Sequence, residues 1–185
     1  MGTAGGHIFW ITSRAAGIAA LLLASASVGV GLLQSARRTP IGRGELRGLH
    51  EALSIATIVA LVVHGATLLG DGFMHPNVAD LTVPFASPYQ PLWTSLGIVS
   101  GWALIVLGLS YYARQRIGVA LWRRIHRFTA LAWLGGLAHS LGEGTDSGEA
   151  WFLLIVGIAV VPPLGMLLAR LVRSDLGSRP ERLAA

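Results

Sequence analysis

The stretch LHEALSIATIVALVVHGATLLG, residues 49–70, decides the fold. Apart from Glu51 and two histidines, it is built of apolar and small residues. Its length matches the roughly 20 residues that a helix needs to cross the hydrocarbon core of a membrane. The stretch therefore predicts a transmembrane helix that carries His50 near one end and His64 near the other.

Four further apolar runs flank this stretch. Together they predict five spans, at about residues 8–33, 49–70, 92–112, 121–141 and 151–171, with a short cytoplasmic tail over 172–185. Hydrophobic residues make up 53% of the chain and charged residues 12%, whereas a soluble domain is about 25% charged. We therefore expect one all-α domain over residues 1–185, an integral membrane bundle of five transmembrane helices.

The arginines indicate how the spans are oriented. All 14 basic residues are Arg, and apart from Arg14 they gather between spans one and two, around the junction of spans three and four, and at or after the end of span five. Residues 71–92 and 143–150 carry acidic side chains and no Arg. Because Arg-rich segments stay in the cytoplasm, we expect a multi-pass plasma-membrane protein with its N-terminus outside and its C-terminus in the cytoplasm. Nucleic-acid binding is not expected, since no continuous basic face is present.

Four of the six histidines fall on spans two and four. These spans run in the same direction, so His50 and His126 are expected near the inner surface, and His64 and His139 near the outer surface. The two levels lie about 21 Å apart along a helix. Imidazoles from two helices can supply both axial ligands of a haem iron, and a chain without Cys would hold such a haem as b-type. The pattern predicts two haem b groups per chain, stacked across the membrane.

The two histidine spacings differ by one residue. The 14-residue spacing of span two leaves its histidines about 40° apart around an ideal helix, and the 13-residue spacing of span four leaves about 140°. Helix tilt, different rotamers or a locally overwound turn must absorb this difference. Gly135-Gly136, between the two histidines, is the expected place for it.

Three shorter motifs accompany the histidines: WITSRAAG (10–17), WRRIHR (122–127) and HSLGEGTD (139–146). With the histidine pairs, they make residues 8–172 resemble the ferric reductase-like transmembrane domain. That family is shared by ferric reductases, NADPH oxidases and the haem-binding membrane subunit of bacterial methionine sulfoxide reductase systems. The chain looks most similar to short bacterial members without attached domains. The resemblance implies that His50 and His126 ligate the iron of an inner haem, and His64 and His139 that of an outer haem.

The resemblance also implies a function, that of a transmembrane di-haem b-type cytochrome passing electrons across the membrane as the membrane subunit of a reductase. No Gly-rich dinucleotide fingerprint follows span five. The expected donor is therefore a separate cytoplasmic flavin-dependent reductase or a membrane quinol, and the extracytoplasmic acceptor stays open. The chain is expected to contribute no catalytic residue, only ligands for electron-transfer groups.

Four arginines are candidate partners of haem propionates. Arg14 lies inside span one, where it needs an anionic partner, such as an outer propionate, or must extend to the interface. Arg47, Arg123 and Arg127 lie within a turn of His50 or His126, but they also serve as topology signals and lipid-headgroup contacts. For the second ring nitrogen of each ligand, the candidate partners are Ser54, Thr129 and backbone carbonyls one turn earlier.

Two other functions fit parts of the pattern. The histidines could serve a metal or proton transporter, although they form two separate levels and not one converging site. A non-catalytic membrane anchor would explain the hydrophobicity but not the paired histidines.

Overall fold

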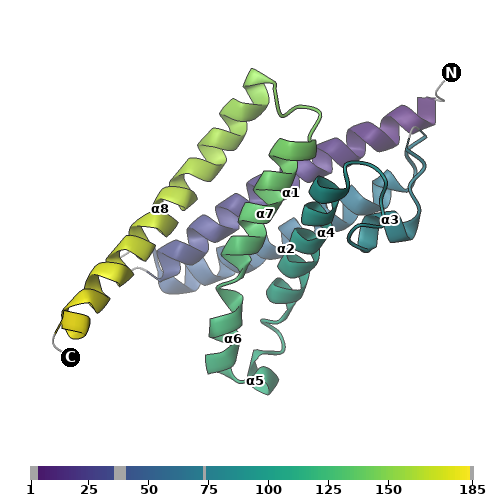
Figure 1. The fold of residues 1–185 in the computed structure, drawn as a ribbon. Helices are drawn as coiled ribbons and strands as arrows, with labels where there is room; N and C mark the ends of the chain where they lie inside the picture. The colour runs from purple at the N-terminus through teal and green to yellow at the C-terminus, as the bar shows by residue number, and fades with distance from the viewer. Residues whose placement is uncertain (1–3, 36–40, 73, 184–185) are drawn as a thin grey trace.

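The structure is a computed structural model that describes residues 4–35, 41–72 and 74–183, with side chains described for residues 7–35, 41–72 and 74–173. Regular secondary structure in these ranges is entirely helical (Figure 1). The elements are α1 (Ala4–Gln34), α2 (Arg43–Leu68), α3 (Val78–Thr82), α4 (Pro91–Leu109), α5 (Arg114–Ile117), α6 (Val119–His126), α7 (Thr129–Glu143) and α8 (Ala150–Leu183). The predicted all-α class is confirmed.

Four helices make up the part of the bundle that matters for the histidines. Helices α1 and α4 each pack against both α2 and α7, so α2 and α7 lie diagonally across the bundle. Helix α8 packs on the outside of α1 (Figure 1). The two histidine-bearing helices, α2 and α7, therefore face each other across a space bounded by α1 and α4.

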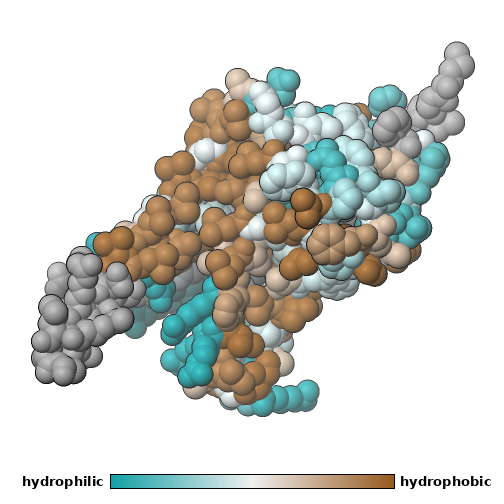
Figure 2. Space-filling view, in the orientation of Figure 1, coloured by the Kyte–Doolittle hydropathy of each residue, from teal (hydrophilic) through white to brown (hydrophobic). Residues whose placement is uncertain are grey.

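Four segments are long and apolar enough to cross a membrane: His7–Gln34, Arg43–Leu68, Pro91–Leu109 and Ala150–Arg173. They correspond to the first, second, third and fifth expected spans. Helix α8 continues through the expected tail to Leu183. The exposed side chains of the bundle are largely apolar, with Ile158 68% and Val161 64% exposed on α8. Figure 2 shows this brown apolar surface along α8, with teal hydrophilic residues at the lower end over α5 and α6.

The expected span 121–141 is not one helix. It is divided into α6 and α7, which are separated at Arg127 and Phe128. At this junction the N–H of Phe128 donates to the carbonyl of Ile125 at 3.0 Å. The N–H of Ala130 donates to the carbonyl of Arg127 at 3.3 Å. Such bonds three residues apart mark a tighter turn than an α-helix has. The locally overwound turn, one of the three expected ways to absorb the 13-residue spacing, therefore lies here, and our assignment of it to Gly135-Gly136, inside unbroken α7, was wrong.

A buried core joins α1, α7 and α8. It contains Leu21, Ala24, Trp133, Phe152, Val156 and Val160. Trp133 is 1% exposed, and its Nε1–H donates to Oγ of Ser25 at 2.9 Å. The Ser25 hydroxyl in turn donates to the carbonyl of Leu21. This chain of bonds satisfies the polar atom of the largest buried side chain and fixes α7 against α1.

Replacing Ser25 by alanine is expected to destabilise the bundle. The indole N–H of Trp133 would lose its acceptor in a fully buried site, which costs about 1–3 kcal/mol. Thermal unfolding in detergent, followed by circular dichroism, should show a lower midpoint. Thr12→Ala is the control, because the Thr12 hydroxyl bonds only the carbonyl of Ile8 in its own helix. Equal midpoints for the two variants would contradict the role assigned to Ser25.

Candidate functional site

Helix α1 holds both histidines of α2 in the same way. Nδ1 of His64 lies 2.9 Å from the carbonyl oxygen of Ser13, and Nδ1 of His50 lies 2.9 Å from that of Ser27. A carbonyl can only accept, so each Nδ1 carries the proton and each Nε2 keeps a free lone pair. Both rings are therefore fixed in the tautomer that offers Nε2 to a metal.

A glycine one turn after each serine makes room for the ring. A Cβ placed on Gly17 would lie 3.0 Å from Nδ1 of His64, and one on Gly31 would lie 3.2 Å from Cε1 of His50. Both distances are tighter than ordinary carbon contacts. The close approach of α2 to α1 at the two histidines therefore depends on glycine at these positions.

The same arrangement recurs at His139, on helix α7. Its Nδ1 lies 2.9 Å from the carbonyl oxygen of Trp93 on α4. Gly97 follows Trp93 by one turn, and a Cβ there would lie 2.6 Å from Nδ1 of His139. Three of the four candidate histidines thus share one mode of support, a carbonyl and a glycine four residues later on the neighbouring helix.

The fourth histidine, His126, is supported differently. It ends α6 and stacks on Trp122, with the ring centroids 4.9 Å apart. Its Nδ1 is buried and approaches the carbonyl of Leu107 without completing a hydrogen bond. Leu107 is 14 residues after Trp93, so α4 presents its two carbonyls at the spacing that α1 uses. Four residues after Leu107, however, the chain has Tyr111 where the other three supports have a glycine.

The structure brings the predicted pairs together. The ring centroids of His50 and His126 lie 6.2 Å apart, with the ring planes at 89°. His64 lies close enough to His139 and Glu143 for their charges to influence it. Because His50 meets His126 at one end and His64 lies near His139 at the other, α2 and the α6–α7 segment run in the same direction, as predicted from the sequence.

The separation of the inner pair fits two axial ligands of one metal. Metal–nitrogen bonds of about 2.0 Å, with about 1.2 Å from each nitrogen to its ring centre, give centroids about 6.4 Å apart. Among the residues that the structure describes, no three His, Cys, Asp or Glu side chains form a metal-binding group. Two imidazoles per level suit an iron whose other positions are filled by a macrocycle, and not a bare divalent ion, which takes more protein ligands.

Comparison with known proteins tests the resemblance directly. Residues 16–137 match the family model of the ferric reductase like transmembrane component. The chain belongs to this family. No curated protein and no solved structure matches it significantly. The matched region of this ferric reductase-like chain contains His50, His64 and His126, and His139 follows just beyond it.

Arg14 has the anionic partner that its position requires, and the chain itself supplies it. Nε of Arg14 donates to Oδ2 of Asp146 at 3.1 Å, and a second nitrogen bonds Oδ1. The guanidinium also lies 4.2 Å from the ring centroid of Trp10. Asp146 belongs to the segment between α7 and α8, so this pair ties that segment to α1. Pairing of Arg14 with a propionate stays a prediction.

Replacing Asp146 by asparagine is expected to destabilise the ferric reductase-like bundle. Arg14 would lose its carboxylate in a partly buried position, and a hydrogen bond to a charged group contributes about 1.5–3 kcal/mol. We expect a lower thermal midpoint in detergent. Glu149→Gln is the matched control, because Glu149 is an exposed carboxylate of the same segment. A midpoint that Asp146→Asn leaves at the native value would show that the ion pair does not hold this segment.

Around the inner histidines, the candidate arginines lie at the surface. Arg47 is exposed and bonds the hydroxyl of Tyr111, and Arg123 and Arg127 are exposed on or next to α6. Tyr111 contacts Trp122, which stacks on His126. The pairing of these three arginines with haem propionates stays a prediction.

Sequence reasoning missed how the histidines are held. Ser54 donates to the carbonyl of His50 and Thr129 to that of His126, so neither is hydrogen-bonded to a histidine ring nitrogen. The acceptors lie on neighbouring helices. A signal was present, because Ser13 and Ser27 are each followed by glycine after four residues and lie 14 residues apart, the same spacing as His50 and His64.

Proposed function

We propose that this chain is a transmembrane di-haem b-type cytochrome that passes electrons across the membrane. The observation that carries the proposal is the pair of imidazoles at each end of the bundle, with three rings held by Nδ1 so that Nε2 is free. His50 and His126 would hold the inner haem, and His64 and His139 the outer one. When bound, the haems supply one-electron carriers about 20 Å apart along the helices.

The polypeptide contributes ligation and burial to this function. Carbonyls of α1 and α4 orient the ligands, and glycines let three of the rings pack closely against the neighbouring helices. The Arg-rich ends, including Arg47, Arg123 and Arg127, would face the cytoplasm, with the N-terminus outside. Electrons would enter from a cytoplasmic flavin-dependent reductase or a membrane quinol, so the chain would act as the membrane subunit of a reductase.

Electron passage can be tested in sealed proteoliposomes that contain trapped ferricyanide. An impermeant reductant added outside is expected to bleach the trapped ferricyanide when the haem-loaded native chain is present. His64→Ala and His139→Ala should abolish the bleaching, because each interrupts the path. Bleaching that both variants retain would contradict the proposal.

The same vesicles distinguish a transporter. Uptake of Zn²⁺ by haem-free protein, lost in the histidine variants, would favour metal transport. The structure gives this alternative less support, because the described residues offer no group of three ligands at one point.

A further inference from the structure

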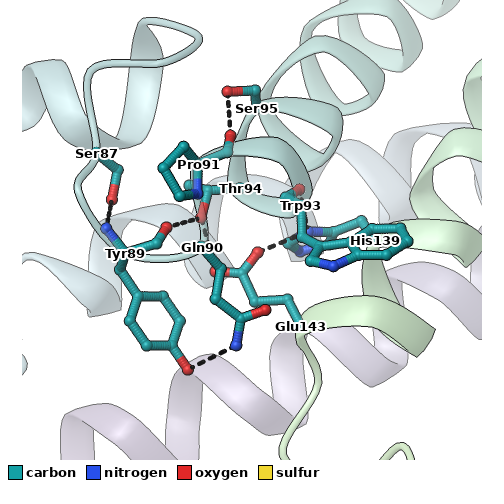
Figure 3. A network of polar contacts seen from close by, with 9 residues as sticks. All are labelled: Ser87, Tyr89, Gln90, Pro91, Trp93, Thr94, Ser95, His139 and Glu143. Carbon is teal, nitrogen blue, oxygen red and sulfur yellow. Dashed lines mark hydrogen bonds and ion pairs between the residues drawn. The ribbon is translucent and has the colours of Figure 1, made fainter.

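Glu143 is the acidic side chain that touches a candidate iron ligand. It lies on the last turn of α7, one turn after His139, and its Oε2 is 3.0 Å from Nδ1 of that ring. The carboxylate is 15% exposed. Its other oxygen lies 2.8 Å from the hydroxyl of Thr94 on α4, which shares its one proton between Glu143 and the carbonyl of Tyr89. Figure 3 shows Glu143 between the ring of His139 and Thr94.

Both histidines of α2 have neutral hydrogen-bond partners at Nδ1. His50 and His64 each meet a serine hydroxyl and a backbone carbonyl. Glu51, next to His50 in sequence, accepts a hydrogen bond from Tyr112 through Oε1. Across the described side chains, His139–Glu143 is the one histidine–carboxylate ion pair. The two levels of the bundle therefore differ by one negative charge placed directly on a ligand.

The Nδ1–H of His139 donates to the carbonyl of Trp93, so Glu143 meets the ring through its charge and not through a hydrogen bond. A negative charge this close to a ligand stabilises the more oxidised state of the metal. We propose that Glu143 is a positioning residue that lowers the reduction potential of the outer haem through His139. This inference rests on the proposed function. It means that the protein sets the reduction potential of the outer haem by a charged side chain.

The test is a spectroelectrochemical titration of the purified, haem-loaded chain with Glu143 replaced by glutamine. Glutamine can still accept from Thr94 but carries no charge. The midpoint potential of one haem should rise, while that of the other stays unchanged. Glu149→Gln removes the same charge from an exposed site and should shift neither. Two native midpoints in Glu143→Gln would overturn the inference while leaving the haem proposal intact.

A second variant covers the case in which Glu143→Gln loses the outer haem. Thr94→Val breaks the links of the Thr94 hydroxyl to Glu143 and to the carbonyl of Tyr89 but keeps the charge at His139. If Thr94→Val retains both haems at their native midpoint potentials, the charge is what the outer site needs, and the inference holds. If Thr94→Val loses the outer haem as well, Glu143 serves to join two helices, and the inference is wrong. A native chain that binds no haem would instead refute the proposed function.

Discussion

Replacing His64 by alanine is expected to halve the haem bound per purified chain. The variant removes one ligand of the outer pair, while the inner pair of His50 and His126 lies about 21 Å away along α2. The α2 histidine of each pair is held by its own carbonyl, His64 by that of Ser13 and His50 by that of Ser27. The absorbance of the Soret and α bands per chain should therefore fall by about half, with the remaining haem still six-coordinate.

Removal of a ligand from the inner pair extends this prediction. His50→Ala should also leave one haem, and the double variant with His64→Ala should leave none. His75→Ala is the control, because His75 is exposed in the segment between α2 and α3. A His64→Ala protein that keeps the full haem absorbance would show that this histidine is not a ligand.

Replacing Gly97 by alanine is expected to remove the outer haem without any change to a ligand. The new Cβ would lie 2.6 Å from Nδ1 and 2.7 Å from Cε1 of His139, distances that real Cβ atoms do not show. The imidazole must move, which breaks its bond to the carbonyl of Trp93 and shifts Nε2. Haem content should fall toward one per chain, as with the direct removal of His139.

The helix itself provides the control for this variant. Gly101 is one turn further along α4, and a Cβ there would meet nothing within 4 Å. Alanine favours a helix over glycine by about 1 kcal/mol at both positions, so Gly101→Ala should keep both haems. If Gly97→Ala also keeps both, the ring of His139 is not confined as the structure indicates.

Much of the fold was predictable because hydropathy and arginine placement act locally along the chain. Four expected spans correspond to long apolar helices, and the co-directional course of the two histidine-bearing segments followed from the loops. The break at Arg127 and Phe128 was not predicted. Our assignment fell on Gly135-Gly136, but these glycines lie in unbroken α7, whereas the turn before the break is rich in charged side chains.

The supports of the site were harder to predict, because they are contacts between helices. Nothing near Arg14 in sequence indicates that Asp146 meets it, 132 residues later. Likewise, His139 is held by Trp93 of α4 and by Glu143 of its own helix. A histidine spacing reports the depth of each ring, but which backbone carbonyl it meets depends on how two helices pack. The repeated serine–glycine spacing of α1 is the one feature of the local sequence that we find to reflect that packing.

The measurement that tests the account most directly is the haem-to-protein ratio of the purified native chain, from its pyridine haemochrome spectrum. We expect a red protein with a b-type spectrum and two haems per chain. A colourless protein that stays colourless after reconstitution with haem would contradict it.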